Sequence, residues 1–192
     1  MKNLCGNNFL ALLKHGVEID QLIKRRDRDE IAQHTTTDMM SLSHGQRLSP
    51  SPLVPACIYL ILIIIFSVNA AFILQSLQLT PPRFLAFYFP LLLGVIVITS
   101  LAAGLVGRGH AVGLRIFMYL YLANLFVFCL VLALAVIADE AIAANKVILF
   151  MCEIAVLCLG RRLMNGTAFT LFTLYRRTIR LAMVAQHLNV AR

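Results

Sequence analysis

The residue whose type and position could do chemistry in this chain is Glu153, which lies inside the apolar run VILFMCEIAVLCLG at residues 147–160. It is the one residue of that run that would normally carry a charge. A carboxyl group among apolar side chains favours its neutral form unless a cation is near. Such a group is a candidate proton or cation site. Its chemistry therefore depends on the element that holds it and on the polar groups beside it.

The composition predicts that this element is a membrane-spanning helix. The chain has 192 residues, of which 60% are hydrophobic and only 14% are charged, and a soluble domain of this length could not bury so much apolar surface. Four runs approach the roughly 20 apolar residues that a span needs, at 56–77, 84–106, 116–138 and 141–160. The last is the weakest because Asn145 and Lys146 interrupt its start. We predict an all-α integral membrane protein, an up-down four-helix transmembrane bundle over residues 55–160.

The basic residues predict the orientation of these spans. Of the 17 Lys and Arg residues, seven lie in the lead (1–54), two in the loop between the second and third spans and six in the tail (161–192). Only Arg83 and Lys146 fall on the other side. Because Lys and Arg collect on the cytoplasmic side, both termini should be cytoplasmic, and we expect a bacterial cytoplasmic (inner) membrane.

The two ends of the chain carry separate signals. Within the lead, residues 9–33 place Phe9, Leu13, Val17 and Ile23 at helical intervals, which predicts an amphipathic helix followed by a linker. The charged run KRRDRDE reads as a solvated face rather than a nucleic-acid patch, because acidic residues interleave the basic ones. We therefore expect no nucleic-acid partner.

The tail predicts a basic amphipathic helix after a turn at Asn165-Gly166. One interpretation places this helix in the membrane interface, with its arginines on anionic lipid headgroups. The other packs it on the cytoplasmic end of the bundle or on a partner. The residues expected to contact headgroups are Arg108, Arg115, Arg161, Arg162, Arg176, Arg177 and Arg180.

Distances along the helices predict the neighbours of Glu153. Glu153 and Asn124 each lie about 12 Å from the inner boundary, and Thr99 and Ser100 lie about 10 Å from it. We expect Glu153 to point into the bundle and to bond with Asn124 and with Thr99 or Ser100, while Asn69 lies at another depth. This polar layer is either interhelical glue or a proton or cation site.

Small residues form the other interface signal. They recur at four-residue steps on the first two spans and allow close helix approach, within the bundle or with another protein. The residues concerned are Ser67, Ala71, Gly94, Ser100, Ala103, Gly104 and Gly107.

No catalytic set is visible in the sequence. It has no glycine-rich phosphate loop, HExxH pair, Ser-His-Asp set or Cys/His cluster, so we expect no catalytic residue, metal or cofactor and a protein that is not an enzyme. The leading hypothesis is lateral contact with another membrane protein or a second copy, in an accessory, assembly, inhibitory or immunity-type role. The alternative is a small proton- or cation-coupled transporter or channel-forming oligomer that uses Glu153. A lipid-modifying enzyme comes third.

Overall fold

The computed structural model describes residues 5–25, 30–31, 33, 50–137 and 144–190, and the elements within these ranges are helices without any strand. The predicted all-α class is therefore confirmed for this part of the chain. Six helices are defined: α2 (Asn7–Arg25), α4 (Leu53–Ser76), α5 (Pro81–Gly107), α6 (Ala111–Ile137), α7 (Ala144–Met164) and α8 (Thr167–Val190).

Three of these helices are long and apolar enough to cross a membrane. They are α4, α5 and α6, and they coincide with the first three predicted spans. The fourth predicted span also forms a helix, α7, but this helix carries Lys146, Glu153 and two arginines in its last turn. The apolar character of α4, α5 and α6 supports an integral membrane protein.

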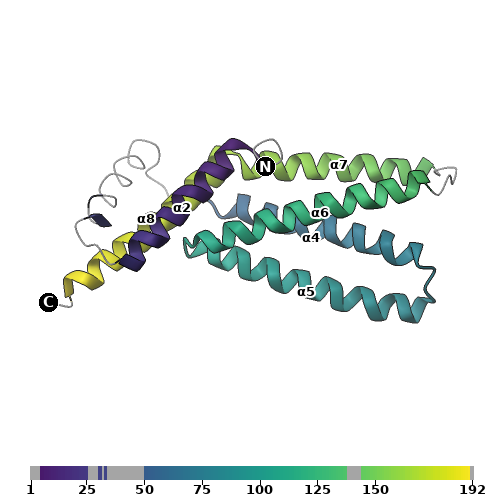
Figure 1. Cartoon of the computed structure of the whole chain (residues 1–192), viewed down its shortest axis with the longest axis horizontal. Coiled ribbons are helices and arrows are strands. Elements are labelled where there is room, and N and C mark those ends of the chain that lie inside the picture. The colour runs from purple at the N-terminus through teal and green to yellow at the C-terminus, as the bar shows by residue number, and fades with distance from the viewer. Residues whose placement is uncertain (1–4, 26–29, 32, 34–49, 138–143, 191–192) are drawn as a thin grey trace.

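The four helices that correspond to the predicted spans, α4 to α7, do not form a symmetrical bundle. Helix α4 packs on α5, α6 and α7, and α5 also packs on α6, so α4 and α6 form a central pair. In Figure 1, α5 and α7 lie on opposite sides of that pair. The contact between α6 and α7 includes the edge-to-face rings of Phe128 and Phe150. A side chain on α5 therefore lies far from one on α7 even where the two are at a similar depth.

The helix boundaries follow local sequence signals. Helix α5 begins at Pro81, a position that lacks a backbone donor and needs none in the first turn. It continues through Pro90 and ends at Gly107. Helices α7 and α8 are separated at Asn165 and Gly166, which confirms the predicted turn.

Helices α2 and α8 pack against each other at one end of the long helices (Figure 1). The buried stripe of α2 contains Phe9, Leu12 and Ile19, and Phe9 stacks on Phe169 of α8. The predicted helix over residues 9–33 is present as α2 as far as Arg25, although its buried face includes Leu12 and Ile19 rather than Leu13 and Val17. Most of the predicted linker, at residues 34–49, lies outside the described residues.

Candidate functional site

Glu153 lies in the interior of the molecule, where its side chain is only 5% exposed. It projects from the middle of α7, which packs on α4. Neither of its carboxyl oxygens makes a hydrogen bond to any described residue. We expected this side chain to point into the protein because a charged group facing lipid would be costly, and it does so.

The polar neighbour of Glu153 is Asn69 of α4, a residue that is 1% exposed. Its side chain lies beside the carboxyl group of Glu153. Even so, the two groups do not reach hydrogen-bond geometry, and all four of their terminal polar atoms are without a hydrogen-bond partner among the described residues. The site thus places a buried carboxyl group beside a buried carboxamide.

Asn69 was not predicted as a neighbour of Glu153, because distances counted along each helix require the ends of the spans to be level. The register of α4 and α7 shows otherwise. Gly160 of α7 lies against Ile61 of α4, since a Cβ atom at Gly160 would meet Cγ2 of Ile61 at 3.2 Å. Asn69 follows Ile61 by eight residues, and Glu153 precedes Gly160 by seven. In antiparallel helices these steps, of about 12 and 10 Å, place the two side chains at one level.

Asn124 of α6 is buried, as expected, but it does not bond to Glu153. Its Nδ2 atom donates to the backbone oxygen of Leu62 on α4 at 3.4 Å. The amide therefore ties α6 to α4, the central pair of helices. The predicted hydrogen bond between Asn124 and Glu153 is not made.

Thr99 and Ser100 of α5 are not neighbours of Glu153 either. The Thr99 hydroxyl donates to the Val95 oxygen of its own helix at 2.6 Å, and the Ser100 hydroxyl donates to the Tyr59 hydroxyl at 3.3 Å. The reason is the arrangement of the helices, because α5 and α7 lie on opposite sides of the α4–α6 pair. The polar layer predicted from depth is therefore distributed over separate helix contacts.

The small residues divide into two groups. Ser67 bonds to the hydroxyl of Tyr88 across the α4–α5 contact, Ala103 packs on the buried core and Ala71 is half-buried. In contrast, a Cβ atom built at Gly94, Gly104 or Gly107 of α5 would meet nothing within 4 Å. These three glycines are not used for packing within the described chain.

The arginines predicted to contact headgroups fall into two groups, those exposed at the surface and those that contact other parts of the chain. Arg108, Arg115, Arg161 and Arg162 are exposed, so contact with headgroups remains a prediction for them. Arg177 is only 1% exposed and donates to the Leu12 oxygen of α2 at 2.7 Å, so its predicted headgroup contact is wrong. Arg176 lies over the ring of Phe172. Helix α8 therefore uses part of its basic face to hold α2.

Arg180 joins three elements at the loop between α5 and α6. Its Nη1 atom donates to Asp20 of α2 at 2.5 Å and to the Gly109 oxygen at 3.2 Å. The other carboxylate oxygen of Asp20 accepts from the backbone nitrogen of Ala111, the first residue of α6, at 3.1 Å. An acid is favourable at a helix N-terminus. Arg180 thus forms an intramolecular ion pair, and its contact with lipid headgroups stays a prediction.

His110 lies in the same loop, next to this ion pair. Burial lowers the pKa of its imidazole, and the positive charges of Arg180 and Arg108 lower it further, whereas Asp20 acts in the opposite direction. The loop approaches α8 closely, because Gly109, with a φ of +77°, would place a Cβ atom 2.9 Å from the Arg176 oxygen. A proton on His110 would therefore add charge to a tightly packed contact.

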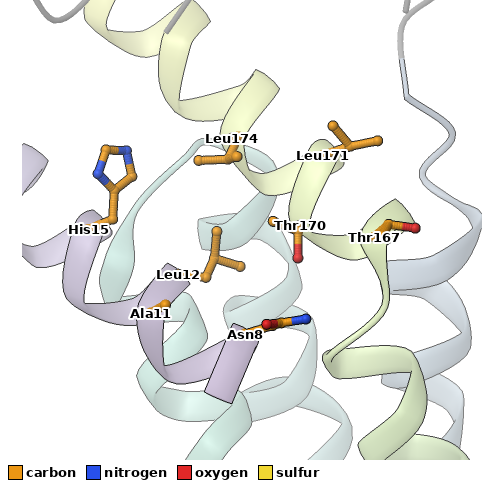
Figure 2. Close-up of a pocket in the computed structure, with 8 residues that line it drawn as sticks. All are labelled: Asn8, Ala11, Leu12, His15, Thr167, Thr170, Leu171 and Leu174. Carbon is orange, nitrogen blue, oxygen red and sulfur yellow. The ribbon is translucent and has the colours of Figure 1, made fainter. Parts of the chain in front are cut away.

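Figure 2 shows a groove between α2 and α8, with a volume of about 460 Å³. Its lining is mostly apolar, and His15 is the only titratable residue that lines it. The hydroxyl of Thr170, another lining residue, donates to the Gly166 oxygen of its own helix at 3.2 Å. The lining residues are Asn8, Ala11, Leu12, His15, Thr167, Thr170, Leu171 and Leu174. None of the other described residues that line the groove is an acid or a thiol.

Comparison with protein-family models, curated proteins and solved structures found no match. Among the described residues, no cluster of three His, Cys, Asp or Glu side chains could hold a metal ion. Three features of the chain itself bear on its function: the Glu153 and Asn69 pair, the outward glycines of α5 and the attachment of α2 to α8.

Proposed function

We propose that this chain is a four-span membrane protein that acts by lateral helix contact with another membrane protein, in an accessory, assembly or inhibitory role without catalysis. The observation that carries the proposal is the face of α5 that contains Gly94 and Gly104. Neither glycine has a neighbour within the described chain. We further infer that α7 is the fourth span and that both termini are cytoplasmic, in a bacterial inner membrane.

The face of α5 is suited to a second helix. At 100° per residue, Gly94, Val97, Leu101 and Gly104 lie within about 80° of one another around the helix. Val97 is 51% exposed and Leu101 61%, so two apolar side chains stand beside the glycine positions. Helix α5 is also the least covered of the three apolar helices, with 22% of its span buried against 39% for α4 and 33% for α6. Small residues permit close backbone approach to a partner helix, whereas they gain little from lipid tails.

The contact between α2 and α8 supports a fourth span. Helix α2 precedes α4 in the chain and α8 follows α7, yet the two pack together and therefore lie on one side of the membrane. An even number of crossings must separate them, so α4, α5 and α6 need a fourth. Helix α7 has 21 residues, or about 31 Å, which matches a hydrocarbon core of about 30 Å.

Affinity capture of the full chain from its native membrane in a mild detergent tests the proposal. We expect a membrane protein or a second copy to copurify in stoichiometric amount, and we expect Gly94→Leu and Gly104→Leu to abolish this. The matched control is Ala155→Leu, which places a leucine at an exposed position of α7. Loss with the α5 variants and retention with the control support the proposal. Absence of any stoichiometric partner, or retention in the Gly104→Leu variant, contradicts it.

A further inference from the structure

We propose that Glu153 and Asn69 form a proton-binding site between α7 and α4, in which a neutral carboxylic acid pairs with the carboxamide. This site does not involve α5 and does not depend on lateral contact with a partner. Four buried polar atoms, Oε1 and Oε2 of Glu153 and Oδ1 and Nδ2 of Asn69, have no hydrogen-bond partner among the described residues.

Unpaired polar atoms of this kind need an explanation. More than about nine in ten buried polar groups in proteins have a hydrogen-bond partner. The requirement is stricter inside a membrane, where no bulk water reaches the hydrocarbon core. Here the unpaired atoms belong to two buried side chains at one level of the packed helices α4 and α7, at 5% and 1% exposure. The two groups are therefore each other's candidate partners.

The chemistry of the two groups requires one proton. An ionised carboxylate has only acceptors, whereas a carboxamide has one acceptor oxygen and an NH₂ donor. The ionised pair can thus make one hydrogen bond and leaves Oδ1 of Asn69 facing a negative charge. When a proton from the aqueous phase adds to Glu153, the new O–H donates to Oδ1 of Asn69. Nδ2 of Asn69 then donates to the other carboxyl oxygen, and all four atoms are paired.

A proton fits the site better than a metal ion. Glu153 and Asn69 supply three oxygen atoms, whereas Ca²⁺ takes six to eight oxygen ligands. Helix α4 contains no charged residue. On α7 the nearest charged positions are Lys146 and Arg161, seven and eight residues away, or about 10 and 12 Å along the helix. On α6, Asn124 is already bonded to Leu62, and the one charged residue, Arg115, is exposed near the start of the helix. No described cation therefore compensates the carboxylate from these three helices.

The site also has a mechanical consequence, because α4 is the main helix that α7 packs against. In the protonated state, two hydrogen bonds join the middle of α7 to α4. Loss of the proton leaves a buried charge opposite an acceptor oxygen and weakens this contact. Occupancy of the site by a proton therefore controls how firmly α7 is held.

Infrared spectroscopy of the full chain in lipid nanodiscs tests the proposal. We expect the C=O band of a protonated carboxylic acid near neutral pH, and we expect this band to shift in D₂O and to disappear reversibly as the pH is raised. Glu153→Gln should remove the band, and Asn69→Leu should change its frequency because a hydrogen-bond partner is lost. Glu18→Gln is the matched control, since it removes an exposed carboxyl group on α2 and should leave the band unchanged.

Thermal unfolding in the same nanodiscs provides a second measurement. Glu153→Gln supplies an N–H where the acid has its O–H, so it can make the same two bonds to Asn69 and should unfold as the protonated wild type does. At alkaline pH the wild type should become less stable than this variant. Absence of a protonated-acid band near neutral pH, a band that ignores Asn69→Leu or a band that never titrates would each overturn the proposal.

Discussion

Asn165 joins three parts of the chain through one side chain. Its Nδ2 atom donates to the backbone oxygens of Cys5, at 2.6 Å, and Arg161, at 2.9 Å. Its Oδ1 atom accepts from the backbone nitrogen of Phe9, in the first turn of α2, at 3.2 Å. Gly6 is required beside it, because its φ is +86° and a Cβ atom there would clash with Oδ1 of Asn165. The residue that ends α7 therefore also caps α2.

Replacing Asn165 should detach the start of α2. Asn165→Ala removes a cap and two donor contacts, which costs about 1 kcal/mol for a partly exposed site. We expect amide hydrogen exchange in the first turns of α2 to become about fivefold faster, since about 1 kcal/mol corresponds to that factor. The control is Asn7→Ala, at an exposed position of the same turn. Equal exchange in the two variants would show that Asn165 does not hold α2.

At the scale of single elements, α8 shows what sequence pattern leaves undecided. Its apolar and basic residues fit both an interfacial helix and a helix packed on protein, and both environments require the same amphipathic period. The choice is decided by partners remote in sequence, because Leu12 accepts from Arg177 and Asp20 pairs with Arg180. The helices themselves could be predicted, since long apolar runs and the Asn165-Gly166 turn are local signals. Asn69 could not be found beside Glu153 in the same way, because the offset between α4 and α7 is set by their packing.

The contact of α2 and α8 with the α5–α6 loop should weaken in acid. Burial, with Arg180 and Arg108, lowers the pKa of His110 below its ordinary value of 6.5, so the packed loop binds a proton less readily than a detached loop does. The stability of the contact is then complete above about pH 6.5 and is lost as the pH falls below that value. We expect hydrogen exchange in α2, corrected for its intrinsic pH dependence, to be faster at about pH 5.5 than at about pH 7.5.

His110→Gln should remove this acid sensitivity, because an amide does not titrate in this range. His187→Gln is the control, since His187 is an exposed histidine of α8 and its replacement should leave the response to acid intact. If acid loosened α2 equally in the wild type and in His110→Gln, another group would be responsible.

Contacts at one end of the long apolar helices bear on how the chain crosses the membrane. Asp20, which precedes the first apolar helix, bonds to Ala111 at the start of α6. It also pairs with Arg180, which follows α7. These contacts support the proposed topology, in which the lead, the α5–α6 loop and the tail share one side of the membrane. This agrees with the 15 basic residues that the sequence places in those three regions.

The topology distinguishes four spans from three. A reporter that is active only outside the cytoplasm should give a signal when it is fused after residue 79 or 140, and no signal after residue 110 or 192. If α7 did not cross, fusions after residues 140 and 192 would both be active. That outcome would separate α8 from α2 by the full membrane, in conflict with the stacked rings of Phe9 and Phe169. The reverse pattern, with signal after residues 110 and 192 and none after 79 and 140, would place the termini outside. It would contradict the predicted orientation but leave the number of spans at four.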